Sequence, residues 1–161
     1  MEDILLTNFT IEELKVKILH KPFEPFKIWG IPVFMNTETT LFQGELFKKH
    51  PDISLPFEVS NFGRIKVDGK ILLQYPDIGK KQEDDPYGYL KIWYNNSWYE
   101  EYVYRLVAKT WCENPNPELY KIVHHISNNG MDNRKENLMW VTKAQHDEIH
   151  NFMESRKGRN M

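Results

Sequence analysis

The C-terminal third of the chain, residues 122–154, limits the fold more than any other segment. Residues 122–125 read as a strand that ends in two adjacent histidines, and an Asn/Gly-rich loop follows them. Residues 138–142 read as a second strand, and Thr142 is a suitable N-cap for a helix from about Lys143 to Glu154. The pattern therefore predicts a unit with the order strand, loop, strand, helix.

Histidines are concentrated in this unit: four of the six in the chain fall between positions 124 and 150. His146 and His150 are four residues apart, so on a helix they share one face. Successive strand residues point to opposite faces, so only one of His124 and His125 can face that pair. Neutral imidazole is a common metal ligand and a common general base. The spacing therefore favours a site in which the two adjacent histidines have different roles.

The preceding residues predict mostly strands. Alternating residues on both sides of a turn at 60–63 predict a hairpin, and two aromatic-rich strands, 89–94 and 98–103, flank Asn95-Asn96-Ser97. Apolar residues at helical spacing predict a helix over 104–111, and residues 74–88 read as a polar loop. Nearer the N-terminus, a capping box at Thr10 predicts a short helix to about His20.

Composition bounds the class of protein. With 161 residues, 40% hydrophobic, the chain can form one domain or two small modules that share a surface. Cys112 is the only cysteine, so an intrachain disulfide is excluded and any metal must be held by His or oxygen ligands. No stretch approaches the ~20 apolar residues of a membrane span. We therefore expect an intracellular, cytoplasmic protein without a membrane partner.

The net charge of −2 is an average over unlike parts. Residues 104–161 carry nine Lys and Arg against seven Asp and Glu, whereas residues 1–103 carry twelve against sixteen. The balance therefore does not exclude DNA as a partner, because phosphate contacts depend on where the positive charges lie. It predicts modest non-specific affinity with a shallow salt dependence.

A longer pattern resembles a known family. Val123-His124-His125-Ile126, then Asp132 to Leu138, then Trp140-Val141-Thr142 and His146, is similar to the HNH endonucleases, with H, N and H at His125, Asn137 and His146. Upstream, residues 57–65 and 105–108 resemble the module that often precedes this nuclease in phage and intron-encoded homing endonucleases. The resemblance covers about residues 55 to 150.

The resemblance implies an α+β fold, with a small β-rich module followed by a ββα-metal nuclease unit. It implies that His125 is the general base, that Asn137 orients the His125 imidazole, and that His124 and His146 hold one divalent ion, with His150 as a third ligand. Homing relatives commonly carry oxygen ligands at these positions, which suit Mg²⁺, whereas the imidazoles here are similar to bacteriocin-type HNH nucleases and favour softer ions. Mg²⁺, Mn²⁺, Zn²⁺ and Ni²⁺ therefore all stay open.

The resemblance also implies the partner and the domain organisation. We expect double-stranded DNA as substrate, with phosphate contacts from four basic residues: Arg64, Lys66, Arg105 and Arg134. We expect an N-terminal extension over 1–54, a DNA-binding-like module over 55–103 and the nuclease over 104–161. A lone site of this kind cuts one strand, so double-strand cleavage would require a homodimer or a second binding event. The alternatives are a non-specific toxin- or defence-type HNH nuclease and a non-catalytic, zinc-stabilised DNA-binding module.

Overall fold

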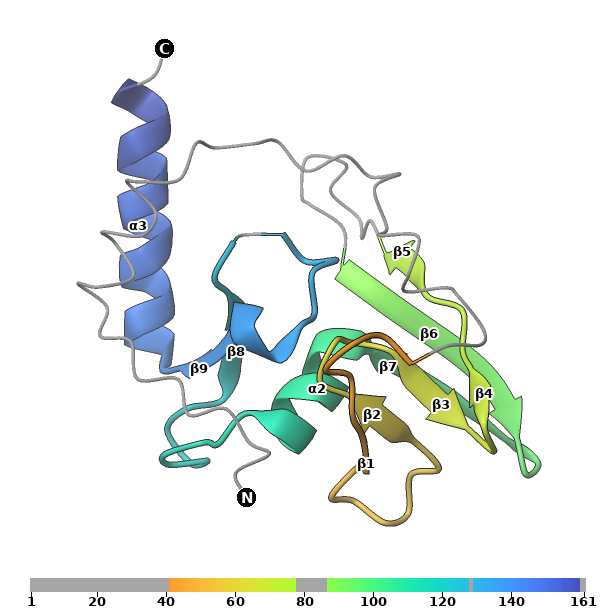
Figure 1. Ribbon diagram of the computed structural model, residues 1–161. Helices are drawn as coiled ribbons and strands as arrows, with labels where there is room; N and C mark the ends of the chain where they lie inside the picture. Colours follow the sequence, from red (N-terminus) through yellow and green to blue (C-terminus); the bar gives the residue numbers. More distant parts are fainter. Residues whose placement is uncertain (1–40, 78–86, 128, 160–161) are drawn as a thin grey trace.

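The computed structural model describes residues 41–77, 87–127 and 129–159 (Figure 1). Its elements are β1 (Phe47–Lys49), β2 (Glu58–Ser60), β3 (Ile65–Val67), β4 (Lys70–Ile71), β5 (Tyr75–Asp77), β6 (Tyr87–Tyr94), β7 (Ser97–Tyr102), α2 (Val103–Trp111), β8 (Ile122–His125), the 3₁₀ turn η2 (Lys135–Asn137), β9 (Leu138–Val141) and α3 (Lys143–Arg159). The predicted helix at 10–20 lies outside the described residues.

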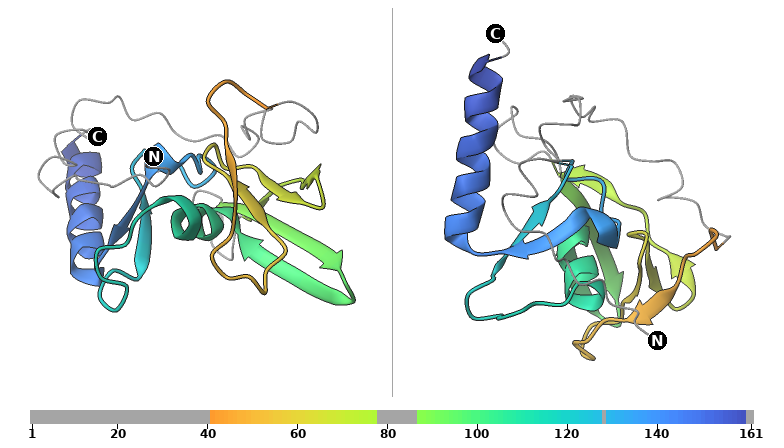
Figure 2. Two further views of the ribbon diagram at one scale, coloured as in Figure 1. Left: turned by 60° about the horizontal axis from the view of Figure 1, so that its bottom comes forward. Right: turned by 60° about the vertical axis from the view of Figure 1, so that its left-hand side comes forward.

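The strands form three small antiparallel sheets, with the orders β1-β2-β3-β4, β5-β6-β7 and β8-β9. Helix α2 lies between the β8–β9 hairpin and the two larger sheets in all views, and α3 stands at one side against the β8–β9 hairpin (Figures 1 and 2). The expected α+β fold is confirmed, with the strand, loop, strand, helix unit at its C-terminal end.

Helix α2 forms because its apolar residues recur at helical spacing and cover most of its surface. Val103, Leu106, Val107 and Thr110 are buried, as is the terminal Trp111. The Trp111 indole donates to the backbone carbonyl of Val59 on β2, at 2.9 Å. One hydrophobic cluster joins α2 to β2, β3, β6 and Leu138 of β9. The helix therefore ties the upstream sheets and the C-terminal unit into one core.

Turn chemistry sets the β2–β3 and β6–β7 hairpins. Asn95 and Asn96, between β6 and β7, have φ of 52° and 63°, as a two-residue hairpin turn of the primed type requires. Gly63, between β2 and β3, has φ of 95°, which a residue with a side chain rarely adopts. Both hairpins were expected at these positions, and both expectations are confirmed.

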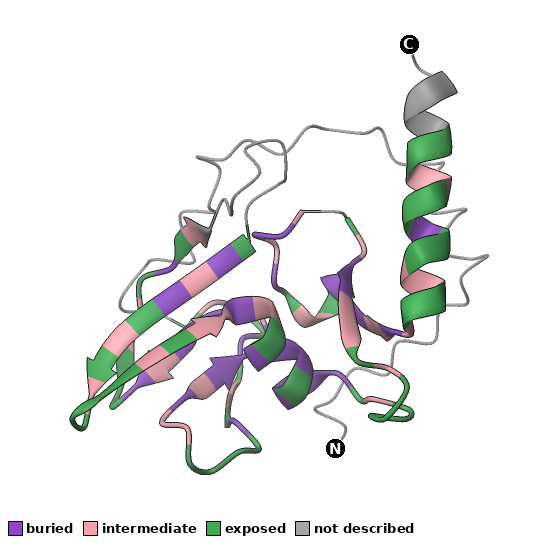
Figure 3. Ribbon diagram, turned by 180° about the vertical axis from the view of Figure 1, so that it is seen from behind, coloured by how far each residue is buried: buried purple, intermediate pink, exposed green. Residues whose placement is uncertain are grey.

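A capping box begins α3. The Thr142 hydroxyl accepts from the Gln145 amide at 3.1 Å, and the Gln145 side chain accepts from the Thr142 amide at 3.0 Å. Ile149 is buried against Met139 and Val141, but most of the helix is exposed (Figure 3). The helix runs five residues beyond the expected end at Glu154.

Three strands lie where none was expected, and one of them is β4, which pairs with β3 after the turn at Asp68-Gly69. β1 falls within the predicted N-terminal extension and pairs with β2, and β5 falls in the predicted polar loop and pairs with β6. β5 is a three-residue edge strand that contains Pro76, so its residues carry no alternating signal, and proline is tolerated at an edge. Within the described part of the chain, no helix is long and apolar enough to cross a membrane.

Candidate active site

The β8–β9 hairpin positions the two adjacent histidines. In its register His124 pairs with Met139 and His125 with Leu138, so the strand is regular to its end. The two imidazoles therefore have separate surroundings, as the alternation of a strand requires. Both residues are buried, with 5% of their surface exposed.

The His124 side chain, at the end of β8, faces the first turns of α3. Its ring centroid lies 6.4 Å from that of His146, and the His146 and His150 rings are 4.4 Å apart. The two Nε2 atoms of the helical pair approach to 3.2 Å. The structure thus brings His124, His146 and His150 to one side of the unit, as the spacing of the sequence predicted.

Lowered pKa values favour the neutral forms of His124 and His146. Burial, together with the neighbouring His125, His146 and His150, lowers the pKa of His124 to about 3. Burial, then His150, also lowers the pKa of His146. His124 Nε2 is buried and has no hydrogen-bond partner among the described residues. No group of three or more His, Cys, Asp or Glu side chains in those residues already has the arrangement of a metal site, so the three-histidine ligand set stays a prediction.

His125 contacts a different set of side chains. Its Nε2 lies 2.8 Å from Oδ1 of Asn133, and its ring packs against those of Tyr87 and Tyr104, at 5.7 and 5.3 Å between centroids. Because an amide oxygen only accepts, this contact places the proton on Nε2 and leaves Nδ1 as the proton acceptor. Burial lowers the pKa of His125, while the Asn133 hydrogen bond and the charge of Asp132 act in the opposite direction.

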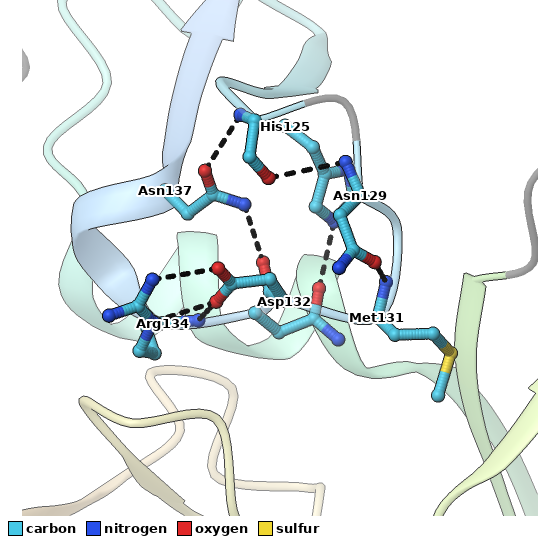
Figure 4. Close-up of polar contacts among 8 residues, drawn as sticks. His125, Asn129, Met131, Asp132, Arg134 and Asn137 are labelled. Carbon is cyan, nitrogen blue, oxygen red and sulfur yellow. Dashed lines mark hydrogen bonds and ion pairs between the residues drawn. The ribbon is translucent and has the colours of Figure 1, made fainter. Parts of the chain in front are cut away.

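Asn137 holds the loop rather than the imidazole (Figure 4). Its Oδ1 accepts from the Ser127 amide and its Nδ2 donates to the Asp132 carbonyl, both at 2.8 Å. Its own carbonyl accepts from the Ile126 amide at 2.7 Å. The expected contact between Asn137 and His125 is thus replaced by one from Asn133, four residues earlier. Sequence reasoning missed Asn133 because the two asparagines lie in the same short motif.

The predicted DNA-contacting residues differ in exposure. Arg64 is 1% exposed, forms a two-pronged ion pair with the buried Glu45, and stacks on Phe42, so the prediction that it contacts DNA is wrong. Burial needs a partner for the charge, and Glu45 provides it. Lys66 lies with Nζ 4.0 Å from the ring centroid of Phe47.

Two further basic residues lie near the histidines. Arg105 is exposed at the start of α2, and its Nε lies 3.2 Å from the hydroxyl of Tyr104, whose ring contacts His125. Arg134 is half exposed and pairs with Asp132 in the loop through two contacts of 2.8 Å. Arg105 is thus connected to the His125 ring through Tyr104.

Comparison with known proteins agrees with this site. Residues 112–148, from the end of α2 to the first turns of α3, match a family model described as HNH endonuclease. Two uncharacterized HNH endonucleases of Acanthamoeba polyphaga mimivirus are 39% identical over 101 residues and 31% identical over 116 residues. These matches cover 62% and 69% of this chain but only 30% and 27% of the relatives. The chain therefore spans less than a third of the length of those relatives.

A solved structure gives the same result for the fold. The chain resembles the solved structure of the HNH homing endonuclease I-HmuI, which describes DNA binding and cleavage by that enzyme. The TM-score is 0.51 and the sequence identity is 28%. The likeness covers 68% of this chain and 59% of that one. The fold and the matched segment are therefore similar to those of HNH nucleases. The resemblance to HNH endonucleases expected from the sequence is confirmed.

Proposed function

We propose that this chain is a DNA endonuclease or nicking enzyme, of the homing type, that hydrolyses phosphodiester bonds with His125 as general base and one divalent metal ion. One observation carries the proposal: the end of β8 separates two neutral histidines, one toward His146 of α3 and one toward Asn133. A hydrolytic site of this kind needs a base and a place for a metal side by side. The matched family segment covers all of these residues.

His125 is suited to accept a proton. Its Nε2 is occupied by Asn133 Oδ1, so Nδ1 is the free basic atom. In the proposed step, Nδ1 takes a proton from a water molecule while the water oxygen bonds to phosphorus and the bond to the leaving 3′ oxygen breaks. Tyr87 and Tyr104 pack against the ring and limit its rotation. The imidazole is therefore held in one orientation before the substrate binds.

His124, His146 and His150 are the residues that would hold the metal. The buried Nε2 of His124, without a partner among the described residues, fits a ligand atom, and its low pKa keeps the lone pair available at neutral pH. When bound, a divalent ion supplies positive charge that polarises the phosphate and stabilises the leaving oxygen. Imidazole donors accept Mn²⁺, Ni²⁺ and Zn²⁺ more readily than Mg²⁺. Availability decides among them as much as affinity does.

Arg105 is proposed as the phosphate contact beside the base. It is exposed, and its contact with the Tyr104 hydroxyl places it next to the ring that packs on His125. A guanidinium there can neutralise a phosphate oxygen of the DNA backbone without reading the base sequence. The same role is proposed for Arg134, since its side chain is half exposed in the catalytic loop.

A plasmid-nicking assay tests the proposal. Wild-type protein and His125→Ala are compared with Mg²⁺, Mn²⁺, Ni²⁺ and Zn²⁺, together with DNA and metal affinities for both proteins. We expect nicking to fall by at least about 10²-fold in His125→Ala, while both affinities persist. Nicking by pure His125→Ala at the wild-type rate would refute the base assignment. Absence of nicking by the wild type with every metal would favour a binding module instead.

The homing assignment needs a separate test. Digestion of a large phage genome yields discrete fragments if the enzyme is site-specific. A smear would instead indicate a non-specific nuclease of the toxin or defence type. Sedimentation with and without DNA then tests whether a homodimer forms on the substrate.

A further inference from the structure

Asn133, the amide that contacts His125, lies where three distant parts of the chain meet. It is completely buried, although it sits in a loop between β8 and η2. Its Oδ1 contacts His125 Nε2, and its Nδ2 has no hydrogen-bond partner in the described residues. Packing, rather than a second hydrogen bond, therefore has to set the rotation of this amide.

The packing comes from two glycines of the upstream sheets. A Cβ added to Gly88, at the start of β6, would lie 2.8 Å from Asn133 Nδ2, a separation that real Cβ atoms essentially never show. A Cβ added to Gly63, in the β2–β3 turn, would lie 3.1 Å from the Asn133 carbonyl oxygen and 3.3 Å from its Cβ. A methyl group at either glycine would therefore crowd Asn133.

Backbone hydrogen bonds fix the same loop to the same two places. The Lys135 amide donates to the Asn61 carbonyl in the β2–β3 turn at 3.0 Å, and the Gly88 amide donates to the Gly130 carbonyl at 3.2 Å. These bonds attach the loop on either side of Asn133. The upstream sheets therefore determine where this residue lies.

We infer that the β2–β3 turn and the first residues of β6 are positioning elements for the general base: Gly63 and Gly88 hold Asn133 so that its amide keeps the His125 ring in the Nε2–H form. Asn133 is a positioning residue, since it acts through His125. The inference rests on the proposed function for its catalytic consequence, but the predicted tautomer does not depend on nuclease activity. It implies that residues 112–148, which match the HNH endonuclease family model, do not include the two glycines that position Asn133.

Gly88→Ala is the most selective perturbation. Gly88 does not have a positive φ, so alanine adds no backbone strain, and the two other close atoms, Gln74 Oε1 and Val103 Cβ, lie at ordinary distances of 3.5 and 3.6 Å. The atom that must move is the end of the Asn133 side chain. We expect the protein to fold, the amide to rotate away, and the contact with His125 to be lost.

Gly63→Ala and Gly69→Ala form a matched pair. Both glycines have positive φ, 95° and 78°, so alanine strains the backbone similarly in both. Nothing lies within 4 Å of a Cβ at Gly69, whereas Gly63 adjoins Asn133. An effect of Gly63→Ala that exceeds that of Gly69→Ala therefore reports contact with the loop.

Two measurements test the inference. Long-range ¹H–¹⁵N correlation spectra of the protein without DNA or metal report the His125 tautomer, and single-turnover nicking with DNA affinity separates rate from binding. We expect a single Nε2–H form in wild type and Gly69→Ala, and a mixture in Gly88→Ala and Asn133→Ala. The nicking rate should fall on the order of 10- to 100-fold in the latter two, with DNA affinity within about twofold of wild type.

A double variant distinguishes loss of the Asn133 contact from a general loss of stability. Because Asn133→Ala removes the atom that Gly88→Ala displaces, the combined variant should match Asn133→Ala alone in rate and in tautomer. Additive losses, or a wild-type tautomer in Gly88→Ala, would overturn the inference. A wild-type protein that shows the expected tautomers but never nicks DNA would instead refute the proposed function and leave the positioning of His125 intact.

Discussion

Replacing Asn137 with alanine tests whether this residue holds the loop or orients the His125 imidazole. The Asn137 side chain is buried and makes two hydrogen bonds of 2.8 Å, to the Ser127 amide and the Asp132 carbonyl, which close the loop across ten and five residues. The resemblance to HNH endonucleases predicted an effect on His125 itself. The structure predicts a loss of stability and a less ordered loop instead.

The expected loss of stability depends on whether each hydrogen-bond partner of Asn137 can bond water after the substitution. Ser127 is exposed, so its amide can bond water after the substitution, and the loss there is about 1 kcal/mol. The Asp132 carbonyl accepts from a buried amide, and leaving it without that donor costs about 1–3 kcal/mol. The sum is about 2–4 kcal/mol, which lowers Tm by about 5–15 °C for a chain of this size.

Urea unfolding at neutral pH measures this loss, and Asn129→Ala is the matched control. Asn129 is another amide of the same loop, but its Oδ1 accepts a single bond, from the Met131 amide at 2.9 Å, so its loss should be about 1 kcal/mol or less. If Asn137→Ala unfolds within about 0.5 kcal/mol of the wild type and yet changes the His125 tautomer, the reasoning is refuted. In that case Asn137 acts on the ring, as the sequence first suggested.

Further predictions concern the buried ion pair, the exposed arginine and the metal. Arg64→Ala should cost about 3–5 kcal/mol, measured by urea unfolding, because it leaves the Glu45 carboxylate buried without its partner; unchanged stability would contradict the pairing. Burial raises the pKa of Glu45, but the hydrogen bonds from Arg64, Ser60 and the Phe42 amide and the charge of Arg64 together outweigh it, so the net shift is downward. That contribution to stability is therefore complete above the ordinary pKa of 4.5 and is lost as pH falls through the lower folded value. Unfolding from about pH 6 to about pH 3 should show this loss in the wild type and a smaller one in Glu45→Gln. Arg105→Ala should weaken DNA binding about equally for all sequences and reduce the salt slope by about one, measured by titration at several salt concentrations; an unchanged slope would exclude a phosphate contact. Removal of divalent ions with a chelator should abolish nicking and leave the circular dichroism spectrum unchanged, since the main core is hydrophobic; unfolding would favour a structural zinc site.

The parts of the fold that were predictable are those set by local chemistry. The hairpin at Asn95-Asn96, the capping box at Thr142 and helix α2 depend on residues at most a few positions apart, and all three form as expected. Strands β1, β4 and β5 were missed because each has two or three residues at a sheet edge and is defined by its partner strand. A short edge strand leaves little periodicity in the sequence.

The site shows the same division between local and distant causes. The positions of His146 and His150 on one helix face follow from their spacing, and they approach each other as expected. The burial of Arg64 depends on Glu45, 19 residues away, in a segment to which the sequence assigned no role. The role of Asn133 depends on glycines 70 and 45 residues earlier in the chain, Gly63 and Gly88. Contacts of this kind cannot be read from a motif, because the motif holds only one side of each.

The adjacent histidines show why strand regularity matters for the proposed chemistry. A base and a metal ligand that share one environment would each perturb the other, because a bound cation disfavours protonation of a nearby imidazole. At the end of β8 the two rings are only one residue apart, yet the strand sends His124 toward α3 and His125 toward Asn133. The regular pairing of His124 with Met139 and His125 with Leu138 maintains that separation. A bulge at this pairing would turn one ring to the wrong side, so β9 is as necessary to the site as the histidines that it pairs with.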